Sequence, residues 1–158
     1  MAHEYTATVR WERGGGSFAD NRYSREHVWL FDGGTQVPAS PAAANVPPGC
    51  ARADAVDPEE AFVAAISSCH MLFFLAFAGK RGFVPDSYED NALGVMTKNE
   101  RGKLFVSRVT LDPKIAWSGE NRPSAEEVAA MHHRAHEECF LANSVRTEVV
   151  VAGLPAHP

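Results

Sequence analysis

The sequence predicts an α+β domain in which antiparallel sheet surrounds one buried helix. The first observation is a run over residues 61–78 that is apolar on nearly every side. A helix without a polar face must be surrounded by protein, so this helix is expected to be central. The second observation is a pair of β-favouring segments, 88–98 and 104–117, joined by turn residues at 99–102. This pattern is typical of a β-hairpin.

The N-terminal third of the chain predicts two strands and a long loop. Residues 5–11 alternate between polar and β-favouring types, and 22–31 read as a second strand after the turn Gly14-Gly15-Gly16. Residues 35–56 are rich in proline and are expected to form a long irregular loop.

Both predicted helices begin at recognisable capping residues. Asp57 suits the N-cap of the central helix, and Pro58 suits its first position. Residues 124–127, Ser-Ala-Glu-Glu, form a capping box that opens a second helix to about residue 138. A final strand is expected over 144–151, which gives the order strands, helix, hairpin, helix and strand.

Length and charge limit the function classes. The 158 residues fit a single domain over 1–158, and a net charge of −5 without a basic cluster argues against nucleic acid or an anionic membrane as partner. The N-terminus does not read as a signal peptide, and the apolar stretch 61–78 is interrupted by polar residues at its middle. We therefore expect a cytoplasmic protein. Its cysteines, Cys50, Cys69 and Cys139, are expected to be reduced, so that any disulfide is transient.

Cys69 and Cys139 are candidate reactive thiols. A free cysteine in a helix is most often a small buried hydrophobe, but Cys69 has polar neighbours in Ser68 and His70, which must be satisfied somewhere in the core. The two thiols would form a redox pair if folding brings them together. Their separation of 70 positions is compatible with contact without requiring it.

Some residues are compatible with chemistries other than a thiol pair. The histidines could suggest a metal site, but their spacing is weak, and the charged residues of the second helix favour a solvated face; they are His27, His70, His132, His133 and His136. A physiological metal is therefore not expected. A hydrolase or transferase that uses Cys69 with His70 or His27 as base stays open, as does a non-catalytic binding domain.

The sequence resembles the OsmC/Ohr family of organic hydroperoxide reductases. The resemblance rests on three features: the helix start at residues 57–60, Ser68-Cys69-His70 ten residues after Glu59, and the distant segment 139–145 around the second cysteine. The order of elements agrees as well, so the resemblance covers almost the whole chain.

This resemblance implies a thiol peroxidase that reduces organic hydroperoxides and folds as an intertwined homodimer. It also implies that no metal or organic cofactor is used. Cys69 would be the peroxidatic cysteine and Cys139 the resolving cysteine, with a lipoyl-type dithiol as reductant. Glu59 would pair with an arginine that activates the thiol. Arg25 is the preferred arginine, and Arg13 and Arg52 are the alternatives.

Helix geometry limits how Glu59 could act. Ten residues of α-helix span about 15 Å, so Glu59 cannot touch its own Cys69. Either an arginine reaches between them, or Glu59 serves the cysteine of the other subunit. The apolar neighbours of Cys69, residues 71–74, predict faster reduction of bulky apolar hydroperoxides than of hydrogen peroxide if some of them line the pocket.

Overall fold

The computed structural model describes residues 2–15 and 17–155, which form two compact units, Met1–Ala61 and Phe62–Pro158. The boundary falls within the first turns of the long helix. Gly16, the last residue of the predicted glycine turn, lies outside the described residues.

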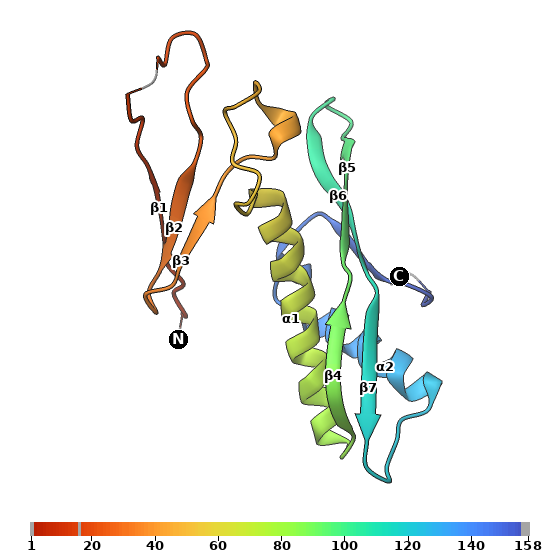
Figure 1. The fold of residues 1–158 in the computed structure, drawn as a ribbon. Helices are drawn as coiled ribbons and strands as arrows, with labels where there is room; N and C mark the ends of the chain where they lie inside the picture. Colours follow the sequence, from red (N-terminus) through yellow and green to blue (C-terminus); the bar gives the residue numbers. More distant parts are fainter. Residues whose placement is uncertain (1, 16, 156–158) are drawn as a thin grey trace. The chain divides into compact units, whose positions relative to one another are not determined.

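The first unit contains a three-stranded antiparallel sheet (Figure 1). Its strands lie side by side in the order β1 (Ala7–Trp11), β2 (His27–Phe31) and β3 (Gln36–Ala39). The two predicted N-terminal strands are confirmed, although each begins later than expected. A short 3-10 helix, η1 (Ala43–Asn45), follows the sheet.

The prediction of an irregular loop over residues 35–56 was wrong at its start, because β3 lies there. Pro38 stands opposite Val28 in this strand. Proline cannot donate a ladder hydrogen bond, and β3 is an edge strand, where that loss is tolerated. The carbonyl of Pro38 still accepts a hydrogen bond from the backbone N–H of Val56 at 3.1 Å. The prolines of this segment therefore did not exclude a strand.

Helix α1 (Pro58–Lys80) begins where the sequence predicted and ends two residues after the predicted run, which reached residue 78. The Asp57 carboxylate accepts the backbone N–H of Glu60 at 2.8 Å, and the Glu60 carboxylate accepts the backbone N–H of Asp57 at 3.1 Å. This reciprocal cap satisfies two N–H groups that a helix start leaves open. At the other end, Gly82 has φ +73° and donates to the carbonyl of Gly79 at 3.0 Å. The left-handed backbone at Gly82 ends the helix.

The single chain buries one stripe of α1. Its buried residues recur every fourth position at Ile66, His70, Phe74 and Ala78. Elsewhere much of the helix is uncovered: Leu72 is 61% exposed, and 22% of the most apolar 18-residue window is buried. By length and composition alone α1 could cross a membrane, a test that the core helix of a soluble protein also passes. Burial on every side, which the sequence predicted, is not reached within one chain.

The predicted hairpin is confirmed and is longer than expected. Its strands are β4 (Val84–Asp90), β5 (Leu93–Lys98), β6 (Leu104–Leu111) and β7 (Pro113–Ser118). β5 pairs with β6 around the predicted turn, and β4 pairs with β7 further from it, both antiparallel. The ladder is interrupted where Asn91 and Ala92 lie between β4 and β5, so the pairs belong to separate sheets.

The remaining elements of the second unit follow the predicted order. Helix α2 (Ala125–Glu138) opens with the predicted capping box between Ser124 and Glu127. After the 3-10 helix η2 (Ala142–Ser144), the final strand β8 (Glu148–Val151) lies parallel to β6. The final strand is shorter than the predicted range 144–151.

Two apolar clusters hold α1 against its neighbours in the second unit. Ile66 packs in the first cluster with residues of β6 and β8, such as Val109 and Val149. Phe74 packs in the second cluster with residues around β4 and on α2, such as Phe83 and Met131. Figure 1 shows α1 running alongside β4 and β7. Cys69 lies between these two clusters along α1.

Candidate active site

The structure brings the two predicted reactive thiols together within the second unit. Cys69 lies near the middle of α1 and is half-buried, whereas Cys139 caps the C-terminus of α2 and is 1% exposed. Both are free thiols, and Cys69 lies near enough to Cys139 to raise the pKa of the Cys139 thiol. Residues 70 positions apart are therefore neighbours in the fold, as a redox pair requires.

The thiol pair is chemically asymmetric. Burial raises the pKa of Cys139 above its ordinary value, and the neighbouring Cys69 raises this pKa further. The backbone N–H of Ala142, 3.4 Å from the Cys139 sulfur, acts in the opposite direction with a smaller effect. Cys139 is therefore protonated at neutral pH.

The segment after α2 holds Cys139 in place. Asn143 donates its backbone N–H to the Cys139 carbonyl at 3.0 Å. Its side-chain amide donates to the carbonyls of Cys139 at 3.0 Å and Glu137 at 2.8 Å. Phe140, which follows Cys139, packs edge-on against Phe73 of α1 with ring centroids 5.1 Å apart. These contacts fix the end of α2 against the helix that carries Cys69.

A buried histidine pair joins α1 to α2 close to the thiols. Nε2 of His70 lies 2.9 Å from Nδ1 of His132, and the two side chains are 1% and 3% exposed. His132 also stacks on Phe74 with ring centroids 4.2 Å apart. Burial lowers the pKa of His132 to about 4, so the ring is neutral at physiological pH. The pair is a hydrogen bond between imidazoles, one donating and one accepting.

The expectation that the histidines of α2 lie on a solvated face was wrong for His132. Helix α2 is amphipathic, with Met131, His132 and Ala135 buried, whereas the side chains of His133 and Glu137 are about half exposed. His132 and Cys139 are seven positions apart, which places them on one helical face two turns apart. That spacing was the sequence signal for a link between His132 and the thiol site.

Arg25, the preferred activating arginine, belongs to the first unit. Its guanidinium donates to Asn21 Oδ1 at 2.5 Å and to the Tyr23 carbonyl at 3.0 Å, and it lies over the Tyr23 ring at 4.1 Å. These partners are neutral, and no carboxylate within the described ranges forms an ion pair with Arg25. Arg25 also lines a mainly apolar hollow of about 490 Å³ in this unit, together with Trp11 and Phe18. Arg25 is thus a cation at an apolar surface with neutral hydrogen-bond partners.

The positive charge of Arg52, by contrast, is offset by two carboxylates. Its guanidinium lies 2.7 Å from Glu26 Oε1 and 2.7 Å from Asp54 Oδ1. The two carboxylates raise the pKa of Arg52 above its ordinary value, and Arg52 in turn lowers the pKa of Asp54. Its charge is less available to a thiolate than that of Arg25. Arg13, the third alternative, makes an interaction of its own.

Glu59 is half-buried in the first turn of α1, in the same unit as Arg25. No ion pair joins these two residues within the part of the chain that the structure describes, since Arg25 is held by Asn21 and Tyr23 instead. Their pairing therefore stays a prediction. The structure brings Cys69 and Cys139 together, and it places Glu59 and Arg25 in the first unit.

Comparison with known proteins agrees with this arrangement of elements. Residues 51–152, well over half of the chain, match the family model of the OsmC-like proteins. The chain belongs to the OsmC-like protein family.

Solved structures with this fold span a wide range of sequence identity. An OsmC-like protein of unknown function from Vibrio cholerae is 49% identical, with a TM-score of 0.92 over 95% of this chain and 98% of that one. An organic hydroperoxide resistance protein OsmC from Legionella pneumophila is 19% identical, with a TM-score of 0.65 over 96% and 95% of the two chains. The organic hydroperoxide resistance protein OhrB of Bacillus subtilis is 20% identical, with a TM-score of 0.62 over 94% and 95%. At 19–20% identity the likeness shows the fold. No curated protein sequence matches the chain.

The third thiol of this OsmC-like chain lies in the first unit. Cys50 is 4% exposed, and its sulfur lies 4.0 Å from the carbonyl oxygen of Pro48. Its backbone carbonyl accepts the N–H of Arg25 at 3.1 Å. Cys50 thus contributes to the packing of the loop beside Arg25.

The alternative chemistries receive less support from this OsmC-like fold. Among residues 2–15 and 17–155, no group of three or more His, Cys, Asp and Glu side chains could hold a metal ion. A hydrolase would need a histidine base for Cys69. Nε2 of His70 is engaged by His132, and Nδ1 of His27 lies 2.8 Å from the Arg25 carbonyl. The proximity of two thiols has no role in a hydrolase mechanism.

Proposed function

We propose that this chain is a thiol-dependent peroxidase that reduces organic hydroperoxides to alcohols and protects the cell against oxidative stress. The observation that carries this proposal is the proximity of the half-buried Cys69 to the buried, protonated Cys139. Two thiols in this relation suit a peroxidatic and a resolving cysteine. The organic hydroperoxide resistance proteins that share the fold are consistent with that chemistry.

Cys69 is the nucleophile in the first step. Its sulfur attacks the terminal oxygen of the hydroperoxide, so an S–O bond forms and the O–O bond breaks. The thiol proton of Cys69 ends on the leaving oxygen, which departs as the alcohol. The sulfur is oxidised to a sulfenic acid, and the peroxide is reduced.

Cys139 resolves the intermediate. Its sulfur attacks the Cys69 sulfenic acid, an S–S bond forms, and the S–OH oxygen leaves with the Cys139 proton as water. A dithiol of the lipoyl type then reduces the disulfide by thiol–disulfide exchange and becomes a disulfide itself. The thiols' proximity means that resolution needs little movement of α1 or α2.

Arg25 and Glu59 are proposed to activate the thiol. A guanidinium beside Cys69 would favour the thiolate and hydrogen-bond the peroxide oxygens. Arg25 suits this role because its hydrogen-bond partners are neutral groups. Glu59 would hold the guanidinium once it leaves Asn21, by a bidentate pair.

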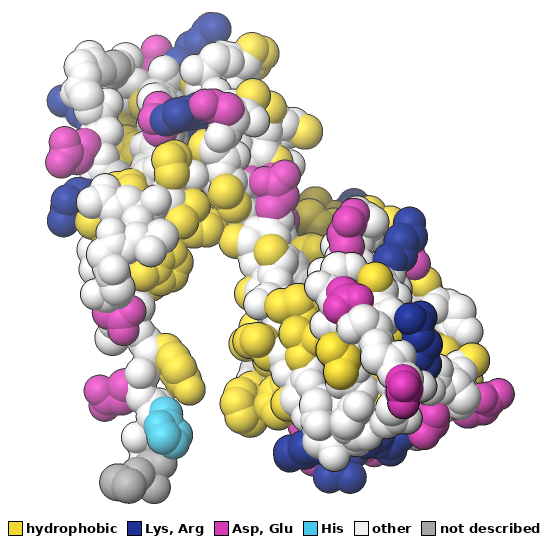
Figure 2. All heavy atoms as spheres, turned by 60° about the horizontal axis from the view of Figure 1, so that its bottom comes forward, with side chains coloured by type: hydrophobic (Ala, Val, Ile, Leu, Met, Phe, Trp, Pro, Cys, Tyr) yellow, Lys and Arg dark blue, Asp and Glu magenta, His cyan; other side chains and the backbone are white. Residues whose placement is uncertain are grey.

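The working form is proposed to be a cytoplasmic homodimer. Large apolar side chains stay uncovered in the second unit, among them Leu72 and Phe140, which are 61% and 69% exposed. Figure 2 shows hydrophobic side chains reaching the surface in several places. A second copy of the chain would cover such groups, at about 25 cal/mol for each Å² removed from water.

Steady-state kinetics with a lipoyl-type dithiol test the proposal. The substrates are tert-butyl hydroperoxide, a fatty-acid hydroperoxide and hydrogen peroxide, and the proteins are wild type, Cys69→Ser, Cys139→Ser and Cys50→Ser. We expect Cys69→Ser to lose activity entirely and Cys50→Ser to keep it. The two organic peroxides should react faster than hydrogen peroxide.

Two results would count against the proposal. Wild-type protein that leaves its thiols intact in the presence of excess organic peroxide would point to a binding domain instead. Equal activity of Cys69→Ser and wild type would show that the reaction does not pass through this thiol.

A further inference from the structure

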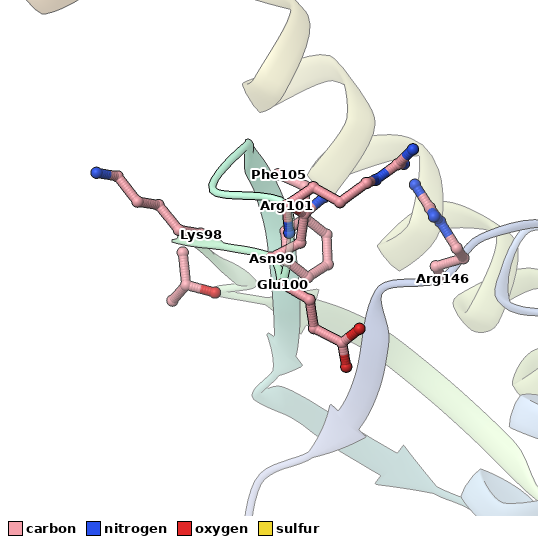
Figure 3. A pocket seen from close by; sticks show the side chains of 7 residues that line it. Lys98, Asn99, Glu100, Arg101, Phe105 and Arg146 are labelled. Carbon is pink, nitrogen blue, oxygen red and sulfur yellow. The ribbon is translucent and has the colours of Figure 1, made fainter.

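A hollow of about 590 Å³ lies at the tip of the β5–β6 hairpin, within the second unit. Its cationic side chains are Lys98, Arg101 and Arg146, and Glu100 is its one carboxylate. In Figure 3, Arg101 from the hairpin turn and Arg146 from the segment before β8 extend toward one another. The half-buried ring of Phe105 forms part of the same hollow.

The two arginines converge without a counterion. Within the described ranges neither Arg101 nor Arg146 takes part in an ion pair, although Glu100 borders the same hollow. Arg108 on β6, by comparison, does form an ion pair, because its guanidinium lies 2.8 Å from the Glu148 carboxylate. Like charges repel, so two guanidinium groups directed into one hollow create a local positive potential on a chain whose net charge is −5.

The backbone that carries these arginines is fixed by hydrogen bonds. Asn99 Oδ1 accepts the backbone N–H groups of Arg101 and Lys103, both at 3.0 Å. Gly102 has φ +71° and donates to the Asn99 carbonyl at 2.8 Å, which closes the turn. On the other wall, the hydroxyl of Thr147, next to Arg146, donates to the Val106 carbonyl at 2.7 Å. A site held this way loses less entropy when it binds a ligand.

We propose that this hollow binds an oxyanion, the carboxylate or phosphate of a small organic molecule, between Arg101 and Arg146. A guanidinium is planar and presents paired N–H donors that match both groups. Lys98 adds a third positive charge, and the Phe105 ring offers an apolar surface to the rest of the ligand. The site is separate from the thiol pair and does not depend on the proposed peroxidase activity.

Calorimetric titration of the full chain tests the proposal with four probes: inorganic phosphate, hexyl phosphate, acetate and octanoate. We expect at least one probe to bind one site per chain, with an affinity that falls as sodium chloride is added. Phosphate probes that bind more tightly identify a phosphate ligand, and carboxylate probes that do so identify a carboxylate. Tighter binding of hexyl phosphate than of phosphate, or of octanoate than of acetate, indicates that the apolar part of the ligand contacts the Phe105 ring.

Single substitutions assign the binding to this hollow. Arg101→Gln and Arg146→Gln should each weaken binding about tenfold, the usual effect of losing a charge-assisted hydrogen bond. Arg122→Gln removes the same charge from an exposed loop outside the hollow and should leave the affinity unchanged. All three arginines are exposed, and a native circular dichroism spectrum shows that each variant is folded. No binding of any probe to wild type, or an equal loss in Arg122→Gln, overturns the proposal.

Discussion

His70 and His132 share a hydrogen bond of 2.9 Å in the interior of the second unit, one position along α1 from Cys69. Their rings are nearly parallel, with an angle of 11° between the planes. The bond crosses from α1 to α2 and thereby fixes the two helices that carry the thiols. Both imidazoles are almost fully buried. A charged imidazolium at this place would lose its contact with water, which costs free energy.

Acid should destabilise the protein through His132. Burial lowers its pKa from 6.5 to about 4, so between these values the unfolded chain binds a proton that the folded chain does not. Stability therefore falls as pH drops from 6.5 toward 4, by about 2 kcal/mol between pH 7.5 and pH 5. Urea unfolding at these two pH values measures this loss of stability. In His132→Gln the difference in stability between the two pH values should be smaller by the same amount.

His133→Gln is the matched control for this experiment. His133 lies on the same helix with a side chain that is 51% exposed, facing away from the core. Its substitution should preserve the difference in stability between the two pH values. If His132→Gln and His133→Gln changed that difference equally, the buried imidazole would not be its source.

The close approach of α1 to β5 depends on Gly94. A Cβ built at this position would lie 2.5 Å from Cγ2 of Val63, and Val63 is β-branched and stiff. Gly94→Ala should therefore destabilise the protein by about 1–3 kcal/mol, as overpacking does. Urea unfolding measures the change, and the same substitution made together with Val63→Ala should cost less.

Gly79→Ala provides the comparison within α1. Nothing lies within 4 Å of the Cβ that it would add, and its φ is not positive. Alanine is the better helix former by up to about 1 kcal/mol, so this substitution should be neutral or stabilising. A Gly94→Ala protein as stable as wild type would show that α1 can move away from β5 without cost.

Much of the fold could be predicted because its signals are local. Asp57 with Glu60, and Ser124 with Glu127, are capping pairs that lie three positions apart and determine where α1 and α2 begin. Strand β3 was missed because its place depends on a neighbour: Pro38 is tolerated at the edge of a sheet and nowhere nearer its centre. Sequence alone does not say which strand is the edge.

The site was predicted less completely because its contacts are distant in sequence. Cys69 and Cys139 were candidate thiols from the sequence, and only the fold showed that they are neighbours. The His70–His132 bond spans 62 positions, and the seven-position spacing of His132 and Cys139 indicates a shared helical face without showing that this face is buried. Which face of α2 meets α1 decides this, and that face is a property of the packed helices.

The intermediate on Cys69 should accumulate when Cys139 is removed. Cys139→Ser leaves the attacking sulfur in place but takes away the group that converts its sulfenic acid to a disulfide. After about one equivalent of tert-butyl hydroperoxide, a sulfenic-acid probe should label Cys69 in this variant and label wild type far less. Peptide mapping by mass spectrometry identifies the labelled residue. In Cys69→Ser, labelling of Cys139 at a similar rate would reverse the proposed roles.

Arg25 has neutral partners and Arg52 has carboxylate partners, so substitution of each arginine should show which one activates Cys69. Arg25→Gln removes a cation whose partners are neutral, so kcat/KM for tert-butyl hydroperoxide should fall at least about tenfold. Arg52→Gln removes a cation already paired with Glu26 and Asp54, so the fall should be much smaller. The pH profile adds a readout that a merely structural role would not change: in Arg25→Gln the rise in rate with thiolate formation should move to higher pH. A large loss in Arg52→Gln with none in Arg25→Gln would transfer the activating role to the paired arginine.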